Sequence, residues 1–536
     1  MSTVAHASQA DRPPGTGVAS LPAGLGPEVF AELAQGVAAA PDADRLPVTA
    51  PFTGGWLADL PCSTPDDVTA AYAAARSAQA AWAARPVAER ARVLRRYHDL
   101  VLDRQHQILD LVQAETGKAR RHAFEEVADV AVTAAYYGRR GPGLLRPRRR
   151  TGAYPLLTQV VEHRQPKGVV GVVSPWNYPF TLAMGDGLAA LLAGNAVVHK
   201  PDLQSAFTAL YGVALLHEAG LPADLWQVVV GDGPVIGGAV VDGADYVCFT
   251  GSTAVGREVA ARCGARLVGC SLELGGKNAL LVLDDADLDR AAEGAVRACF
   301  ASAGQLCISA ERLYVAASVY EPFLARFLDR VRRMRLAATY DYRADMGSLV
   351  SARQLTRVQQ HVADAAAQGA RVLAGGKPRP DIGPLFFEPT VLADVRPGMR
   401  CHAEETFGPV VSVHAVGSED EAVARANDTT YGLNASVWTR NAARGRSVAA
   451  RLRAGTVNVN EGYAAAWGSV DAPMGGMGDS GLGRRHGNEG LLRYTEAQTV
   501  AVQRGLGFGT PPGMTAEQFA RTLTVLLRTM KRLGLR

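Results

Sequence analysis

A cysteine and a glutamate in two separate segments have the residue types needed for covalent chemistry on a carbonyl carbon. Cys307 follows Gly304-Gln305, and Glu273 lies between two leucines. A Gly-Gln pair suits a tight turn that exposes the sulfur, a thiolate is a strong nucleophile, and a carboxylate can take a proton from water. The apolar neighbours of Glu273 are expected to raise its pKa toward neutrality. The structural alternatives are a buried, unreactive cysteine and a surface carboxylate at a strand end.

Asn177 is the candidate donor for the negative oxygen that such an attack creates. A tetrahedral oxyanion needs fixed hydrogen-bond donors, and losing one typically costs about 3–4 kcal/mol of transition-state stabilisation. We expect the side chain of Asn177 and the backbone N–H of Cys307 to supply two of them. The alternative for Asn177 is a turn residue in an Asn-Tyr-Pro bend.

Four motifs occur in the order found in the aldehyde dehydrogenase superfamily, which the chain resembles over about residues 48–503. They are Pro175-Trp176-Asn177, Ser271-Leu-Glu273-Leu-Gly-Gly-Lys277, Gly304-Gln305-Leu-Cys307 and Glu404-Glu405-Thr-Phe407-Gly-Pro409. The resemblance implies oxidation of an aldehyde to a carboxylic acid with a nicotinamide cofactor, by way of a thiohemiacetal and a thioester. It assigns the nucleophile to Cys307, the general base to Glu273 and the oxyanion donor to Asn177. The glutamate argues against the branch that passes the acyl group to coenzyme A.

The resemblance also implies a cofactor site assembled from distant segments. Its expected members are Trp176, Asn177, Lys200, Pro201, Asp202, Leu203, Gly251, Ser252, Leu274, Glu405 and Phe407. Residues 249–256 suit a strand-to-helix turn whose N–H groups can hold a pyrophosphate. Family members that use NAD often place a glutamate three residues after this lysine, where the chain has Leu203. Without that carboxylate a 2′-phosphate is not repelled and can pair with Lys200, which favours NADP and leaves NAD possible.

The substrate is a small-molecule aldehyde, and a looser resemblance narrows it. The segments 200–204 and 473–487 are similar to those of actinobacterial-type succinate-semialdehyde dehydrogenases, which implies succinate semialdehyde. Better-understood enzymes of that activity bring two arginines to the substrate carboxylate, at positions that hold Gly185 and Ala301 here. Another arginine has to substitute, or the substrate is an uncharged aliphatic or aromatic aldehyde in an apolar tunnel for which Trp176, Trp467 and Phe300 are available. A non-catalytic binding protein on the same fold is the remote alternative, and the intact Cys307, Glu273 and Asn177 argue against it.

The elements that must position these residues form an α/β fold. Residues 64–140 have helical spacing, and short apolar runs alternate with helical patterns from residue 169 onward, which predicts a parallel sheet with strands at 169–173, 196–199, 226–230 and 246–249. Ligands of such sheets bind beyond the carboxyl ends of the strands, so the loops after them are expected to hold the cofactor. The fold class implied by the resemblance is aldehyde-dehydrogenase-like, with a parallel-sheet dinucleotide-binding domain, an α/β catalytic domain and a small oligomerisation sheet.

Domain boundaries follow from the same patterns and the resemblance. We expect a flexible tail over 1–40, a dinucleotide-binding domain over 41–145 and 166–273, a catalytic domain over 274–470, bridging segments at 146–165 and 489–503, and a linker with an amphipathic helix over 504–536. The bridging segments imply a homodimer or homotetramer. The C-terminal helix is expected to dock on its own or a neighbouring subunit, with membrane-surface binding as the weaker alternative.

Composition excludes several classes of function. At 536 residues the chain exceeds what one core usually serves, and a net charge of +4 is too small to indicate a nucleic-acid partner. The seven cysteines lack metal-ligand spacing, which favours reduced thiols in a cytoplasmic protein and no metal site. No apolar stretch reaches the length of a membrane span, and the N-terminus lacks the pattern of a secretory signal.

Overall fold

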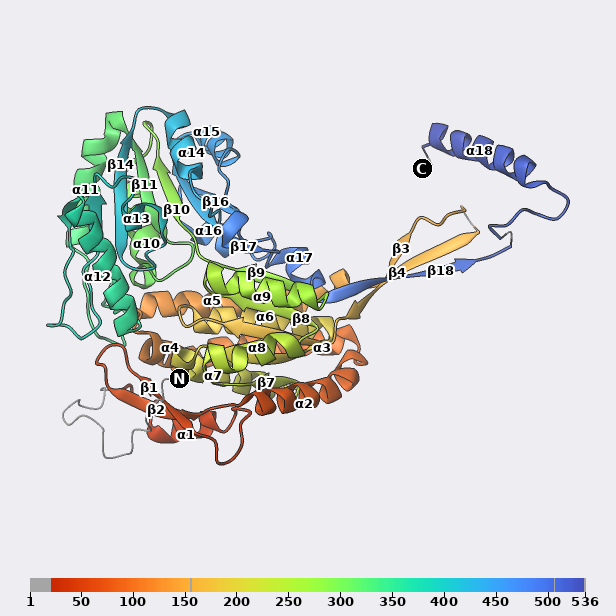
Figure 1. Cartoon of the computed structure of the whole chain (residues 1–536), viewed down its shortest axis with the longest axis horizontal. Helices are drawn as coiled ribbons and strands as arrows, with labels where there is room; N and C mark the ends of the chain where they lie inside the picture. The colour runs from red at the N-terminus through yellow and green to blue at the C-terminus, as the bar shows by residue number, and fades with distance from the viewer. Residues whose placement is uncertain (1–20, 155–156, 506, 535–536) are drawn as a thin grey trace. The chain divides into compact units, whose positions relative to one another are not determined.

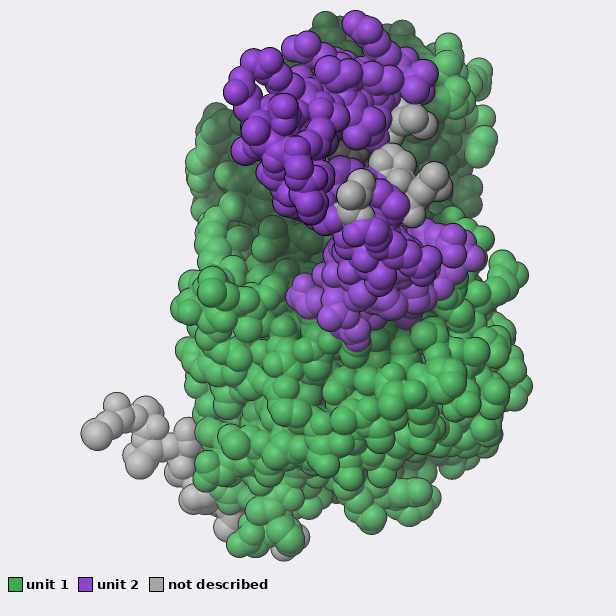
Figure 2. All heavy atoms as spheres, turned by 90° about the vertical axis from the view of Figure 1, so that its right-hand side faces the viewer, with its two compact units in different colours: residues 1–144, 166–494 green, residues 145–165, 495–536 purple. Residues whose placement is uncertain are grey.

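A computed structural model describes residues 21–154, 157–505 and 507–534, and the chain divides into two compact units (Figure 2). One unit comprises residues 1–144 and 166–494, and the other comprises 145–165 and 495–536. The larger unit holds two large sheets with helices packed against them and one two-stranded ribbon, which confirms the α/β class (Figure 1). In the described part of the chain, no helix combines the length and the apolar character that crossing a membrane requires.

The first sheet has six strands in the order β17-β9-β8-β5-β6-β7. The predicted parallel strands are all present, and β17 joins antiparallel to β9 at one edge. The strands are β5 Val169–Ser174, β6 Ala196–Pro201, β7 Trp226–Val228, β8 Tyr246–Thr250, β9 Gly269–Glu273 and β17 Gly481–Leu482. Most of their β-branched side chains are buried, as expected for a parallel sheet covered on both faces.

Two groups of helices cover this sheet. One group contains α3 Val87–Asp103, α4 Gln105–Thr116, α6 Pro179–Ala193 and α7 Ala206–Glu218, and the other contains α2 Pro65–Ala83, α8 Gly233–Gly243 and α9 Thr253–Ala265. The long α5 Arg120–Leu145 follows α4. Helix α2 begins with a reciprocal capping box between Thr64 and Asp67.

The second sheet has seven strands in the order β12-β13-β14-β11-β10-β15-β16. They are β10 Asn278–Val282, β11 Ala310–Ala316, β12 Arg371–Ala374, β13 Thr390–Ala393, β14 Val410–Val416, β15 Asn434–Trp438 and β16 Thr456–Val459. The longer helices of this region are α10 Leu288–Phe300, α11 Tyr320–Arg332, α12 Ala352–Ala367, α14 Glu419–Asn427 and α15 Ala442–Ala449. Short helices α13 Arg400–Ala403, α16 Ala464–Trp467 and α17 Gly487–Leu492 lie in connecting segments.

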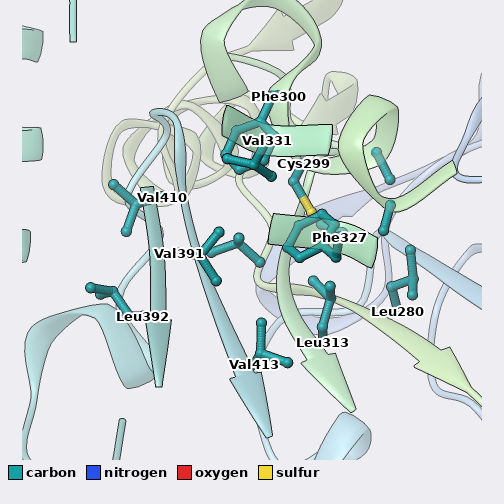
Figure 3. Packing of buried hydrophobic residues seen from close by; sticks show 14 of the residues in the cluster. Leu280, Cys299, Phe300, Leu313, Phe327, Val331, Val391, Leu392, Val410 and Val413 are labelled. Carbon is teal, nitrogen blue, oxygen red and sulfur yellow. The ribbon is translucent and has the colours of Figure 1, made fainter. Parts of the chain in front are cut away.

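A hydrophobic cluster fixes the helix that leads to Cys307 (Figure 3). Phe300, the last residue of α10, is 1% exposed and stacks on Phe327 of α11 with ring centroids 6.3 Å apart. The cluster includes Leu313 and Val413 from neighbouring strands (Figure 3). Phe300 is therefore a core residue, and its expected availability for a substrate tunnel is wrong.

Part of the expected N-terminal tail is folded. Helix α1 Pro27–Ala34 buries Phe30, whose ring lies 4.9 Å from that of Phe207 in an edge-to-face contact. The expectation of a tail over 1–40 is thus wrong for this helix, because the segment supplies apolar anchors between its glycines and prolines. Strands β1 Arg45–Thr49 and β2 Trp56–Pro61 then pair as an antiparallel ribbon. Residues 1–20 lie outside the described residues.

The smaller unit contains a three-stranded sheet in the order β18-β4-β3 and a C-terminal helix. The strands are β3 Arg148–Arg150, β4 Thr158–Pro166 and β18 Thr495–Gln503. Helix α18 Ala516–Arg532 begins with a capping box between Thr515 and Gln518. The second bridging segment was expected from residue 489, but β18 starts six residues later, because Gly487–Leu492 is helical and belongs to the larger unit.

Candidate active site

The nucleophile loop, residues 301–307, has three successive residues with positive φ, and Cys307 at its end is only partly buried. Ser302 and Ala303 have φ of 52° and 55°, and Gly304 has φ of 70°. A Cβ at position 304 would lie 2.1 Å from the carbonyl oxygen of Gly408, so only glycine fits there. Left-handed conformations at non-glycine residues are strained and persist only where surrounding contacts hold them. Cys307 is partly exposed, as predicted from the preceding turn.

Side-chain amides hold this loop in place. Gln305 accepts a hydrogen bond from Val350 N at 3.0 Å and donates to Ser302 O at 3.1 Å. Asn278 donates to the carbonyl of Cys307 at 2.7 Å. Among the described residues no carbonyl accepts the backbone N–H of Cys307. The expected role of that N–H as a donor to a substrate oxygen stays a prediction.

Asn177 points its side chain at the nucleophile loop. Its Nδ2 donates to the carbonyl of Gln305 at 3.0 Å. Its backbone carbonyl accepts a hydrogen bond of 2.5 Å from Lys118, which also pairs with Glu126 at 2.5 Å, and both ionic side chains are fully buried. Lys118 and Glu126 were not predicted as site residues, since nothing in a helical segment at 118–126 signals contact with residue 177. Asn177 lies in a bend over residues 176–178, as in the turn alternative, but it is buried and its carbonyl is held by a buried ion pair.

Glu273 ends strand β9 inside the protein. It is 6% exposed, and burial raises the pKa of its carboxyl to about 7, with Arg485 and Arg493 opposing the rise. Its Oε1 is buried and has no hydrogen-bond partner among the described residues. A carboxyl with this pKa is near half-ionised at neutral pH and can exchange a proton with water. The expected rise in pKa is confirmed, and the surface-carboxylate alternative is excluded.

The thiol of Cys307 is protonated in this arrangement. Burial raises its pKa to about 12, followed by the negative charges of Glu273 and Glu405, while Arg485 lowers it. The two carboxyls are therefore close enough to the sulfur to affect its ionisation. A nucleophilic attack needs the thiolate, so a proton acceptor must take part, and Glu273 exerts the stronger influence of the two.

Several expected cofactor residues follow neighbouring parallel strands. Trp176 comes after β5, Lys200 lies at the end of β6, and Gly251 follows β8. Ser252 caps α9 by accepting a hydrogen bond from the N–H of Val255 at 3.5 Å. The carboxyl ends of these strands share one edge, so an amine and a helix N-terminus suited to phosphate lie along it.

The residues around Lys200 affect its charge. Burial lowers the pKa of Lys200, and the carboxylates of Asp202 and Asp232 oppose the change. Pro201 ends β6, and Asp202 caps the following turn, which starts at Leu203, by accepting from Gln204 N at 3.0 Å. The ammonium group of Lys200 is thus stabilised by the negative charges of Asp202 and Asp232.

Leu274 and Glu405 both make contacts in the segment that joins β9 of the first sheet to β10 of the second. Leu274, 5% exposed, donates its N–H to Ser480 O at 3.0 Å. Glu405 accepts a hydrogen bond from Gly276 N at 2.8 Å, and burial raises its pKa to about 7. A Cβ at Gly275 would lie 2.5 Å from Glu405 Oε2, so the Gly-Gly pair allows this close approach.

Phe407 lies against Trp176 in the same region. The two rings make an edge-to-face contact with centroids 5.5 Å apart. The backbone of Phe407 has φ of 55° and its N–H donates to Glu311 at 2.9 Å, while Glu311 pairs with Lys277. Glu311 was not predicted as a site residue, because its role is to bind a backbone loop from another segment.

An apolar cluster surrounds the nucleophile on the other side. It contains Tyr178, Leu182, Ala301, Leu306, Ile308, Leu433, Tyr463 and Met474, with Cys307, Ala464 and Trp467 packed against it. Next to it is a cavity of about 240 Å³ lined in part by Asp129, Arg297 and Trp467. Trp467 is therefore the expected tunnel aromatic that the structure brings to Cys307, whereas Trp176 contacts Phe407.

Cysteine and acidic side chains show no sign of metal binding. All seven cysteines lie in the described ranges and none forms a disulfide. Within those ranges no three His, Cys, Asp or Glu side chains gather as a metal site would require.

Known proteins resemble this chain over most of its length. The profile of the aldehyde dehydrogenase family matches residues 38–500. A protein of Mycobacterium ulcerans, provisionally named succinate-semialdehyde dehydrogenase (NADP+) 2, is 53% identical over 500 residues, 93% of this chain and 96% of that protein. A Mycobacterium tuberculosis protein with the same provisional name is 55% identical over 482 residues, 90% of this chain and 93% of its own. The betaine aldehyde dehydrogenase of Brucella melitensis is 38% identical over 468 residues, 86% of this chain and 94% of that protein.

Solved structures share the fold. The crystal structure of an E. coli NADP-dependent enzyme superposes with a TM-score of 0.83 at 33% identity, covering 87% of this chain and 96% of that one. Betaine aldehyde dehydrogenase from Staphylococcus aureus in complex with NAD+ gives a TM-score of 0.84 at 28% identity, covering 91% of this chain and 98% of that one. With the family profile matching most of its residues, and with a cysteine, a buried carboxyl and an amide donor gathered at one site, this chain belongs to the aldehyde dehydrogenase family.

Proposed function

We propose that this aldehyde dehydrogenase oxidises succinate semialdehyde to succinate with NADP as its preferred cofactor. The observation that carries the catalytic part is the buried Glu273, whose carboxyl has a pKa of about 7 and raises that of the Cys307 thiol. The provisional names of the mycobacterial relatives, at 53% and 55% identity, support the substrate and the cofactor.

The first step forms a carbon–sulfur bond. Glu273 takes the thiol proton, and the sulfur of Cys307 attacks the aldehyde carbon, whose carbonyl oxygen becomes an alkoxide. The Nδ2 group of Asn177, which also donates to the Gln305 carbonyl, and the backbone N–H of Cys307 donate to that oxygen. Each fixed donor of this kind commonly stabilises the transition state by about 3 kcal/mol or more.

The second half of the reaction releases the acid. NADP, when bound, supplies the acceptor for the hydrogen and the two electrons that leave the substrate carbon. Glu273, having lost the first proton to solvent, then takes a proton from water, whose oxygen attacks the thioester carbon. The carbon–sulfur bond breaks, the carboxylic acid leaves, and the sulfur regains a proton. A single carboxyl can serve both steps because its pKa lies near the working pH.

The donor set on the strand edge fits a dinucleotide. Lys200 and the N-terminus of α9 offer positive charge for phosphates, and Glu405 offers a carboxylate for ribose hydroxyls. Leu203 supplies no carboxylate against a 2′-phosphate, which supports NADP. Steady-state kinetics with each cofactor test this preference: we expect the higher kcat/KM with NADP, and a clear NAD preference contradicts it.

Uncharged aldehydes form the second candidate substrate class, because the cluster around Cys307 is apolar. The kcat/KM for succinate semialdehyde, butyraldehyde and benzaldehyde separates the two classes. A preference for the charged aldehyde supports the proposal, and equal or better use of the uncharged ones rejects it.

We further propose that the sheet of β3, β4 and β18 mediates a homodimer or homotetramer, and that the two sheets of the larger unit serve cofactor binding and catalysis. The sheet-forming segments match those that the resemblance assigns to oligomerisation. Sedimentation velocity on the full chain, compared with a chain truncated after residue 494, tests the first part. A monomeric full-length protein contradicts it.

A further inference from the structure

Arg485 has a buried guanidinium group with a single carboxylate partner. Its side chain is 8% exposed, and its only ion pair within the described residues joins Nε to Asp186 Oδ1 at 3.1 Å. This contact lies outside hydrogen-bond geometry, so Nε is buried without a hydrogen-bond partner. A guanidinium carries five N–H donors, and a desolvated charge without acceptors is strongly unfavourable unless something else binds there.

The charges around Arg485 leave a positive surplus. Asp186 is shared, because Arg493 pairs with the same Oδ1 atom at 2.6 Å. The next carboxyls are Asp129 and Glu273, and burial raises the pKa of each to about 7. Both are therefore largely neutral below pH 7, and each keeps an oxygen without a hydrogen-bond partner in the described chain. One carboxylate thus faces two guanidinium groups.

The guanidinium lies beside the apolar cluster that surrounds the nucleophile. Arg485 and Met474 exchange backbone hydrogen bonds of 2.6 and 2.9 Å, and Met474 belongs to that cluster. A Cβ at Gly185 would lie 3.3 Å from a terminal nitrogen of Arg485, and Leu182, three residues earlier on α6, is another cluster member. The positive charge of Arg485 also lowers the pKa of the Cys307 thiol. Arg485 is thus next to the reacting centre and adjoins the position that lacks its expected arginine.

We propose that Arg485 binds the carboxylate of the aldehyde substrate and so determines the preference for a carboxyl-bearing aldehyde. The inference rests on the proposed function, since it names the residue that would recognise succinate semialdehyde. A carboxylate supplies the paired acceptors that a guanidinium fork matches. The missing side chain at Gly185 leaves room for a guanidinium that arrives from another segment.

Arg297 is the competing arginine and provides a matched control. It lines the cavity next to the cluster, but its side chain is 49% exposed and pairs with Glu461 at 3.5 Å. Its guanidinium also lies over the ring of Tyr463, 5.4 Å from the centroid. Arg297 is already partnered and solvated, so it has less reason to hold a substrate carboxylate.

The test measures kcat/KM for succinate semialdehyde and for butyraldehyde with wild-type enzyme, Arg485→Gln and Arg297→Gln. For Arg485→Gln we expect a loss with succinate semialdehyde on the order of 100-fold greater than the loss with butyraldehyde, the difference typical of a charge-assisted hydrogen bond. A smaller loss shared by both aldehydes is expected, because Arg485 also lowers the pKa of Glu273 and Cys307. Arg297→Gln should leave the ratio of the two values near that of the wild type. Inhibition by succinate should weaken in Arg485→Gln, while inhibition by butyrate stays the same.

Butyraldehyde oxidation also reports folding, because only folded enzyme oxidises it. We expect Arg485→Gln to fold, since Asp186 keeps Arg493 as a partner when Arg485 is replaced. If Arg485→Gln does not fold, Arg485→Lys is read in the same way. An equal loss with both aldehydes means that Arg485 acts on Glu273 alone and overturns the proposal, as does a loss of preference in Arg297→Gln only. If Arg485→Gln keeps a wild-type preference, this inference fails and the proposed substrate stands. A wild-type enzyme without any preference overturns both.

Discussion

Two carboxyls affect the Cys307 thiol, the buried Glu273 and the partly buried Glu405, and they differ in how they are held. Both Glu273, at the end of β9, and Glu405, in the loop before β14, have a pKa raised by burial to about 7. Glu405 accepts a hydrogen bond from Gly276 N at 2.8 Å, whereas Glu273 Oε1 has no partner among the described residues. The two carboxyls thus have similar pKa values but differ in how many of their oxygens are already hydrogen-bonded. A carboxyl with an unused oxygen can bind and activate water, and one tied to the backbone is better suited to hold a ligand.

Replacing Glu273 is the sharpest way to separate the two carboxyls. Glu273→Gln should lower kcat by about 10³-fold or more, because general bases typically contribute 10²–10⁴-fold. The thioester should then accumulate slowly, because its hydrolysis loses the base, whereas the thiol of Cys307 can still lose its proton to solvent before the attack. Intact-mass spectrometry after mixing enzyme, NADP and aldehyde measures this species. Accumulation in Glu405→Gln instead would reverse the assignment.

Asn177→Ala should have the next largest effect, on the opposite half of the reaction. We expect kcat/KM to fall by roughly 10²-fold, the usual consequence of losing one oxyanion donor. No acyl-enzyme should accumulate, because carbon–sulfur bond formation is slowed and every later step depends on it. Thermal unfolding compared with wild type checks that the hydrogen bond from Asn177 to Gln305 is not needed for folding. Rapid-quench detection of a thioester in this variant would contradict the prediction.

Glu405→Gln should have a smaller effect, confined to the cofactor. The amide keeps an oxygen for Gly276 N but loses the charge. We expect KM for NADP to rise by roughly tenfold, the loss of about one charge-assisted hydrogen bond, with thioester hydrolysis unchanged. Initial rates at saturating aldehyde measure it. A wild-type KM for NADP with slowed hydrolysis is the contrary result.

The smallest expected effect is on how the stability of the folded protein changes with pH. The folded pKa of Glu273 is raised from 4.5 to about 7, so the protonated fold is favoured and this stability is lost as pH rises from 4.5 through 7. The full difference amounts to about 3 kcal/mol. Glu273→Gln removes the ionisable group, so its Tm should exceed that of the wild type at pH 8 by more than at pH 5. Calorimetry at both pH values tests this, and a gap that is constant with pH speaks against it.

The sequence predicts the chemistry of this protein better than its substrate recognition. Cys307, Glu273 and Asn177 sit in short motifs whose neighbours reveal them, and the parallel strands follow from apolar runs between helical patterns. Arg485 lies beside an apolar cluster whose residues come from several segments of the chain. Its position depends on the tertiary fold, so no local sequence pattern identifies it. Lys118 and Glu126 support Asn177 from another helix for the same reason.

Errors at the ends of the chain also have physical causes. Helix α1 was assigned to a tail because glycine and proline flank it, yet Phe30 packs edge-to-face on Phe207 and orders the segment. The start of β18 was placed too early because the preceding helix is only one or two turns long. Short elements depend on tertiary contacts more than on their own propensity.

The glycine at position 304 has a mechanical consequence. Its missing methyl group lets the turn that carries the sulfur press against the carbonyl of residue 408, in the loop that presents Phe407. A displacement of either turn must therefore move the other. The loop that carries Cys307 and the loop proposed to contact the nucleotide are thus packed together at this glycine and move as one.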